Sequence, residues 1–221
     1  NNSISFNQIE LLSRDKKTIK SRVIDIKSIN KLPSKIKKKV NQDLEKITRK
    51  REFLTKKSHV IMGVINMTPD SFSDGGKFNS FKRANQRIKK IINSGSDIID
   101  IGGESTRPGS KIISQKHEFA RVKNLISNFK KKFSRTLLSI DTRKSQIIDY
   151  AIKKNADIIN DISCFQFDKI SFNSVKNKNV WKIIHHMQGT PQTMQINPKY
   201  RHVLLDIYDF FEKEIKKLKK D

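Results

Sequence analysis

One pattern recurs five times along the chain, and it constrains the fold more than any other feature of the sequence. A β-branched apolar run leads into a polar or glycine-rich loop, and apolar residues at helical spacing follow. The apolar runs are "VIMGVIN" (60–66), "DIIDIGG" (97–103), "TLLSIDT" (136–142), "DIINDI" (157–162) and "VWKIIHHM" (180–187). Strands alternating with helices in this way predict parallel β-α-β units joined by right-handed crossovers.

Two architectures fit this alternation, an open doubly wound sheet and a β/α barrel. A doubly wound nucleotide-binding sheet should carry a phosphate-binding glycine motif after its first strand, but "MTPDSFSDGGKF" has neither GxGxxG nor GxxxxGK[ST]. Polar residues instead follow every apolar run, as at a barrel active site; they are Asn66, Glu104, Asp141, Asn160 with Asp161, and His185 with His186. We therefore predict an α/β fold of the TIM-type (β/α)8 barrel class. Five of its units are recognisable, and the last three are expected to lie outside this sequence.

Residues 1–58 have a different character. The stretch "SRVIDIK" (21–27) alternates like a strand, and Ile36, Val40, Leu44 and Ile47 repeat at helical spacing after Pro33. We predict a basic N-terminal strand-and-helix extension over residues 1–58 and a partial barrel over residues 59–221. An unfolded basic arm is the alternative for the first segment.

The composition excludes several classes of protein. No apolar run approaches the roughly 18 residues that span a bilayer, and the N-terminal residues lack the pattern of a signal peptide. The lone Cys164 excludes an internal disulfide framework. These features predict a cytoplasmic protein with no membrane partner.

The formal charge of +25 has two interpretations, a nucleic-acid partner or a general excess of lysine. The basic residues are spread along the whole chain, and aromatic residues do not interleave with them as stacking platforms would. We predict no specific nucleic-acid partner. An RNA- or DNA-binding protein is the alternative, and steep salt dependence of binding would reveal it.

Five segments resemble, in order and spacing, the signature segments of the dihydropteroate synthase family. They are "MGVINMTPDSFSDGG", "DIIDIGGESTRPGS", "LLSIDT", "ADIINDI" and "HMQGTPQTMQ". The resemblance implies a barrel enzyme of folate biosynthesis and a target of sulfonamides. Such an enzyme joins 6-hydroxymethyl-7,8-dihydropterin diphosphate to p-aminobenzoate and releases pyrophosphate. It also implies a homodimer for the full-length protein.

A diphosphate leaving group is highly charged and favours Mg²⁺ as cofactor. Asn66 matches the metal-contacting Asn of the family. A neutral amide oxygen can bind Mg²⁺ without repelling the diphosphate. Considered without the motif around it, Asn66 would be a turn-initiating residue before "TPD".

The pterin ring presents a flat row of donors and acceptors, which requires fixed polar partners in a dry pocket. Asp141 and Asn160 match the pterin contacts of the family, and we assign both to the catalytic site. Met187 would pack against the ring, with core filling as the alternative. The family usually has Met at the position of His185, so the role of His185 stays open.

The loops after the first two strands are too long for simple βα connections, which favours substrate-covering lids. The resemblance implies that Thr106 and Arg107 contact substrate, that Phe72 stacks beside the benzoate ring and that Pro108 borders it. Asp74 would hold Arg107 when the loops close, and we assign both to the catalytic set. Packing for Phe72 and a solvated charge for Arg107 are the alternatives.

Two other functions remain compatible with the motifs. Pterin-dependent methyltransferases share the barrel and the Asp and Asn contacts, although they do not need the two long loops in this form. A non-catalytic pterin-binding protein is the second alternative. It would apply if the chain truly ended at Asp221, since the family's remaining pterin and diphosphate ligands come from the second half of the barrel.

Overall fold

The computed structural model describes residues 5–15, 18–49, 59–68, 77–107 and 109–220. Its contacts divide the chain into two compact units, Asn1–Lys57 with His202–Leu205, and Ser58–Arg201 with Asp206–Asp221. Each unit has its own hydrophobic cluster of buried residues. Among the described residues, no helix combines the length and apolar character needed to cross a bilayer.

The N-terminal unit is a β-hairpin with a helix, not the single strand with a helix that the sequence predicts. Strands β1 (Gln8–Asp15) and β2 (Thr18–Asp25) pair antiparallel, and a 3-10 helix (Ile26–Lys31) and α1 (Ser34–Thr48) follow. The sequence analysis missed β1 because only Ile9 and Leu11 of that strand pack against the small core, while charged residues separate and follow them. That core consists of Ile24, Ile29 and Val40.

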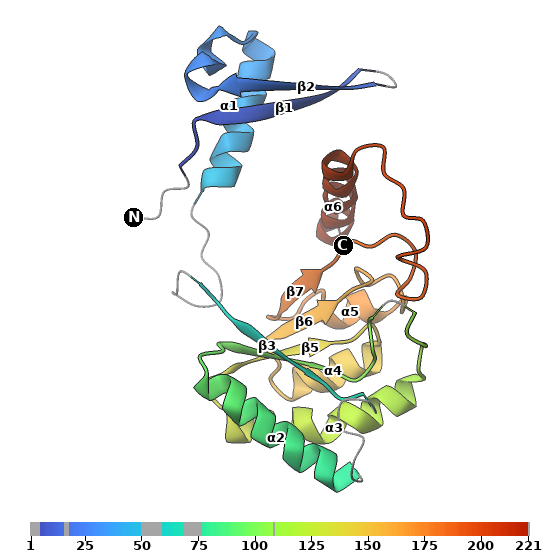
Figure 1. The fold of residues 1–221 in the computed structure, drawn as a ribbon. Helices are drawn as coiled ribbons and strands as arrows, with labels where there is room; N and C mark the ends of the chain where they lie inside the picture. Colours follow the sequence, from blue (N-terminus) through green and yellow to red (C-terminus); the bar gives the residue numbers. More distant parts are fainter. Residues whose placement is uncertain (1–4, 16–17, 50–58, 69–76, 108, 221) are drawn as a thin grey trace. The chain divides into compact units, whose positions relative to one another are not determined.

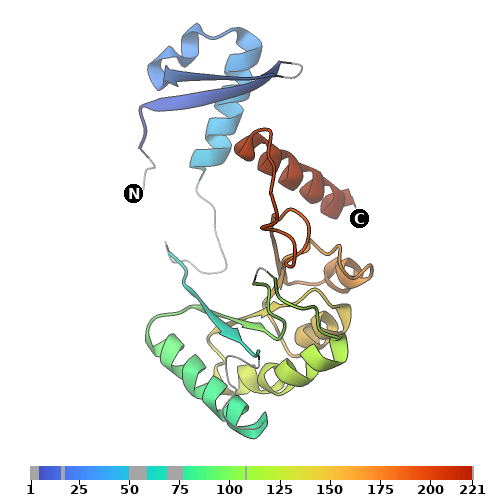
Figure 2. The same cartoon turned by 45° about the vertical axis from the view of Figure 1, so that its right-hand side comes forward.

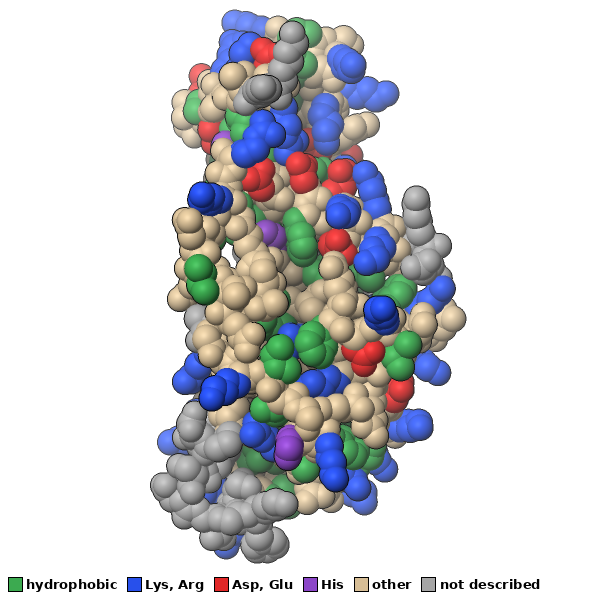
Figure 3. All heavy atoms as spheres, turned by 90° about the vertical axis from the view of Figure 1, so that its right-hand side faces the viewer, with side chains coloured by type: hydrophobic (Ala, Val, Ile, Leu, Met, Phe, Trp, Pro, Cys, Tyr) green, Lys and Arg blue, Asp and Glu red, His purple; other side chains and the backbone are tan. Residues whose placement is uncertain are grey.

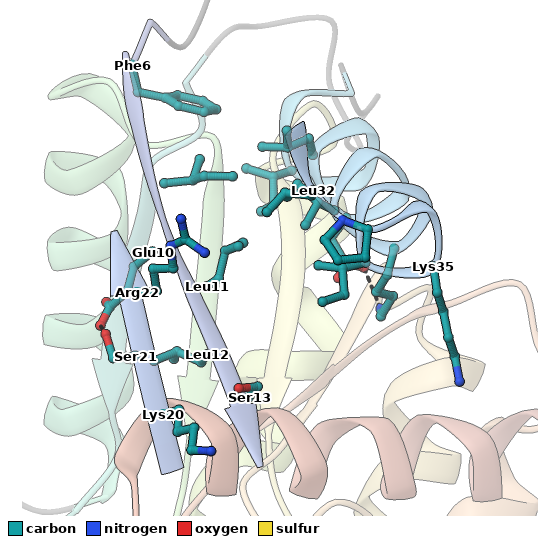
Figure 4. Close-up of a pocket in the computed structure, with 18 residues that line it drawn as sticks. Phe6, Glu10, Leu11, Leu12, Ser13, Lys20, Ser21, Arg22, Leu32 and Lys35 are labelled. Atoms are coloured by element: carbon teal, nitrogen blue, oxygen red, sulfur yellow. Dashed lines mark hydrogen bonds and ion pairs between the residues drawn. The ribbon is translucent and has the colours of Figure 1, made fainter. Parts of the chain in front are cut away.

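An open apolar hollow of about 880 Å³ lies between the hairpin and α1 (Figure 4). Leu11, Leu32, Val40 and Leu44 are among the residues that line it. Every lining residue belongs to the N-terminal unit, so none of the site residues predicted from the sequence contributes to it.

The second unit contains a five-stranded parallel sheet in the order β3-β4-β5-β6-β7 (Figure 1). The strands are β3 (Met62–Asn66), β4 (Ile98–Gly102), β5 (Leu137–Asp141), β6 (Ile158–Asp161) and β7 (Trp181–Ile184). Each strand pairs with the next one along the chain, as in a β/α barrel. In a doubly wound sheet the order of the strands would reverse at a switch point. The predicted barrel class is confirmed, and the structure holds five of its units.

Helices α2 (Lys77–Asn93), α3 (Gln115–Lys132) and α4 (Ser145–Lys153) cover one face of this sheet (Figures 1 and 2). The short α5 (Ser171–Val175) and, from Asp206 onward, the long α6 (Val203–Lys220) complete the unit. Buried side chains from the helices, such as Ile88, Phe129 and Ile148, join one cluster with those of the strands. The strand residues in this cluster alternate along the chain; they are Ile65, Ile99, Ile101, Leu138, Ile140 and Ile159.

The residues between them therefore point to the opposite face of the sheet, which would be the interior of a closed barrel. Val64, Asp100, Ser139, Ile158 and Trp181 form one row across that face. Val64 and Trp181, on the two edge strands, are 49% and 47% exposed, whereas the three residues between them are buried.

Candidate active site

The next row toward the carboxyl ends of the strands is polar. The strand register pairs Asn66 with Gly102, Gly102 with Asp141, and Asp141 with Asn160. Neighbours in register share a face of the sheet, so the structure brings Asn66, Asp141 and Asn160 together on the inner face. Three of the residues predicted from separate sequence segments thus lie side by side at the strand ends.

Gly102 keeps the space between two of these side chains open. A Cβ at this position would lie 3.3 Å from Asp141 Oδ2 and 3.5 Å from Asn66 Oδ1. Because glycine has no side chain, the floor between the amide oxygen and the carboxylate is bare backbone. The row therefore contains a small cradle lined by two oxygens.

Asp141 is in an environment that disfavours its charge. Burial, followed by the neighbouring carboxylates of Asp100 and Glu118, raises the pKa of Asp141 to about 8. These surroundings therefore favour the protonated, uncharged form of the Asp141 side chain. A ligand that presents a positive charge or an N–H donor to Asp141 would instead favour the ionised carboxylate.

The sequence analysis missed Asp100, a carboxylate in the middle of the buried strand β4. Asp100 is 3% exposed, and its Oδ2 accepts a hydrogen bond of 3.1 Å from Asn160 Nδ2. Burial raises its pKa, while the hydrogen bond from Asn160 acts in the opposite direction. The sequence does contain a signal for Asp100, because an aspartate between isoleucines in a strand buried on both faces requires a polar partner.

His185, one residue beyond β7, is the second partner of Asn160. Its Nε2 lies 2.7 Å from Asn160 Oδ1. His186 lies on the other side of the chain, where its ring packs edge-on against Phe210 of α6 with centroids 4.8 Å apart. The two histidines therefore face opposite ways, as alternation of side chains predicts.

A buried ion network lies between the loop after β4 and the residues after β5. Arg143 Nη2 donates to Glu104 Oε2 at 2.6 Å, and Lys144 Nζ contacts both Glu104 and Glu118 of α3. Burial opposes ionisation of Glu104, but the hydrogen bonds from Ile113 N and Arg143 lower its pKa. The network fixes the start of the long loop, so Glu104 has a structural partner in addition to its position at a strand end.

The long loop after β4 carries two of the predicted substrate contacts. Thr106 is half-buried and Arg107 is exposed. The N–H of Gly109 donates to the carbonyl of Pro191 at 3.0 Å, which connects this loop to the segment after β7 that also contains the half-buried Met187. Phe72, Asp74 and Pro108 lie outside the described residues, so the predicted contacts of these three side chains stay predictions.

A metal would find few protein ligands here. Within the described ranges, no group of three or more His, Cys, Asp or Glu side chains could hold an ion. The half-buried Asn66 offers a neutral oxygen beside the Gly102 cradle. This donor set fits a hard cation such as Mg²⁺ only if substrate and water supply most of its ligands.

The sequential parallel strands and the polar row at their carboxyl ends place the second unit in the β/α-barrel class. A profile described as pterin-binding enzyme matches residues 62–221, and the chain belongs to this family. It is 41% identical over 157 residues to a dihydropteroate synthase of Clostridium beijerinckii, covering 71% of this chain and 55% of that protein. The chain thus spans about half the length of the curated relatives it matches.

Solved structures give the same result. A Yersinia pestis dihydropteroate synthase with a sulfonamide drug complex is 36% identical with a TM-score of 0.66, covering 72% of this chain and 57% of that one. A Burkholderia cenocepacia dihydropteroate synthase complexed with 7,8-dihydropteroate is 34% identical with a TM-score of 0.64, covering 76% and 55%.

Proposed function

We propose that the intact protein is a dihydropteroate synthase that condenses 6-hydroxymethyl-7,8-dihydropterin diphosphate with p-aminobenzoate. The observation that carries the proposal is the row Asn66, Gly102, Asp141 and Asn160 on the inner face of the sheet. The relatives bound to 7,8-dihydropteroate and to a sulfonamide support the same assignment.

In this reaction the amine of p-aminobenzoate attacks the pterin methylene. The C–O bond to the diphosphate breaks, the leaving group departs with the electron pair, and the amine loses a proton. The residues of this chain bind and orient the reactants: Asp141 and Asn160 hold the pterin edge through hydrogen bonds, and the Gly102 cradle leaves room for the substrate beside Asn66. Such positioning is a major source of rate acceleration.

Asn66 would contribute one oxygen to Mg²⁺. The metal supplies charge neutralisation for the departing diphosphate. The assignment rests on the match of Asn66 to the family's metal-contacting Asn and on the cradle between Asn66 and Asp141.

The two long loops would cover the substrates. We assign Thr106 and Arg107 to substrate contacts, Phe72 and Pro108 to the benzoate site, Met187 to packing on the pterin ring, and Asp74 to holding Arg107. The buried pair Glu104–Arg143 and the contact of Gly109 with Pro191 support a defined path for the second loop. A homodimer of the intact protein belongs to the same proposal.

Pyrophosphate release by the intact protein tests the function directly. With Mg²⁺ and both substrates, release should require p-aminobenzoate and should be inhibited by a sulfonamide. Asp141→Ala should weaken pterin affinity at least about 30-fold, the scale expected for about 2 kcal/mol of lost hydrogen bonding in a buried site. Normal pterin binding without any pyrophosphate release would replace the synthase assignment with a pterin-binding or methyl-transfer role.

A further inference from the structure

The side-chain amide of Asn160 is held between two partners on different elements. Asp100 Oδ2 on β4 lies 3.1 Å from Nδ2, and His185 Nε2 beyond β7 lies 2.7 Å from Oδ1. Asn160 is 8% exposed and Asp100 3% exposed, so solvent does not compete for the bond between them, whereas His185 itself is exposed. The three side chains form one chain of hydrogen bonds across β4, β6 and the end of β7.

The chemistry of the groups fixes the direction of this chain. An amide nitrogen donates and cannot accept, so Nδ2 faces Asp100 when that side chain is an ionised carboxylate. The amide oxygen then faces His185, and it can only accept. His185 must therefore carry its proton on Nε2.

The amide would be less constrained without His185. The terminal torsion of Asn is broad and roughly two-fold, so a single partner restrains it weakly. With both partners in place, a flip of the amide would lose two hydrogen bonds in a buried site. The remaining lone pair of Oδ1 and the second N–H of Nδ2 are then presented in one arrangement.

We propose that His185 is a positioning and specificity residue that locks the Asn160 amide, so that the site accepts a ligand edge with a donor opposite Oδ1 and an acceptor opposite Nδ2. This inference rests on the proposed function, because it takes the ligand to be a pterin. It assigns a role to a residue at which this chain departs from the usual Met of the family it resembles.

Calorimetric titration of the intact protein with 6-hydroxymethylpterin tests the effect on the ligand. His185→Met removes the donor and should weaken binding roughly tenfold, the loss expected for one hydrogen bond to the buried Asn160 amide, which is then less constrained. His185→Gln keeps an N–H donor of similar reach and should stay within about threefold of the wild type. His186→Gln is the matched control, because the ring of His186 packs against Phe210 and not against Asn160.

Nitrogen-15 NMR of the ligand-free protein tests the positioning without any ligand. His185 should show the Nε2–H tautomer, and Asn160→Leu should remove that preference. Wild-type affinity in both His185 variants, or an Nδ1–H tautomer for His185, would overturn the inference. Failure of the wild type to bind the pterin, with the Nε2–H tautomer present, would instead count against the proposed function.

Discussion

Asn66 and Asp141 flank the bare backbone of Gly102, with Asn66 Oδ1 and Asp141 Oδ2 at 3.5 Å and 3.3 Å from the point where a side chain would begin. The two residues come from β3 and β5, which do not pair with each other, and β4 holds them at this separation. The glycine therefore determines what can enter between them.

Gly102→Ala should weaken ligand binding but leave the stability of the fold nearly unchanged. The methyl group would occupy the cradle, so we expect affinity for the pterin diphosphate to fall more than tenfold. The free energy of unfolding should change by less than about 1 kcal/mol, because the carboxylate can move slightly and alanine reduces the entropy of the unfolded chain. Calorimetric titration and urea unfolding of the same variant measure both quantities. Unchanged affinity would show that the ligand does not approach Gly102.

Asp141→Asn should make the protein more stable, and the gain should grow with pH. The fold raises the pKa of the wild-type Asp141 carboxyl from 3.8 to about 8, so stability falls as pH rises between these values. We expect a gain of about 1–2 kcal/mol at pH 8, less than the full shift because the side chain is only half-buried. The gain should shrink toward pH 5.

Urea unfolding at pH 5, 6.5 and 8 provides the measurement. A difference between Asp141→Asn and wild type that stays constant over this range would mean that the Asp141 carboxyl is not the group responsible.

Lys144→Met should destabilise the protein by about 3–5 kcal/mol. Lys144 bridges Glu104 and Glu118, and all three side chains are at most 6% exposed, so removal of the cation leaves buried carboxylates without their partner. Lys130→Met is the matched control. Lys130 lies 2.5 Å from Asp157, but both side chains are more than a fifth exposed, at 22% and 28%.

Lys130→Met should lower the free energy of unfolding by about 1 kcal/mol, because solvent screens a partly exposed ion pair. Chemical denaturation of both variants gives the two costs. Equal losses in Lys144→Met and Lys130→Met would indicate that the buried network contributes no more than a surface pair.

The basic surface should bind nucleic acid only weakly. On the face drawn in Figure 3, Lys and Arg side chains are scattered among other residues and not collected in one patch. We expect a Kd on the order of 10⁻⁴–10⁻⁶ M for random-sequence DNA at physiological salt, as for non-specific contacts. A fluorescence anisotropy titration that gave nanomolar binding at raised salt would contradict this expectation.

The sequence by itself determined the parallel barrel order of the second unit. Its β-branched runs alternate with helical segments, and each run ends in a polar residue, which is a local signal that needs no knowledge of packing. The same signal placed Asn66, Asp141 and Asn160 among the polar residues at one edge of the sheet, and the resemblance to the family selected these three for the site.

Only the tertiary structure decided which side chains these residues contact. The bond from Asn160 to Asp100 joins positions 60 residues apart, and the ion pair of Arg143 with Glu104 joins positions 39 residues apart. Local periodicity carries no information about such pairs, since they depend on the strand register and on how far each side chain reaches. The contacts of Asp100, Asn160 and Lys144 follow from a buried polar group's need for a partner, and only the folded chain shows which partner is near.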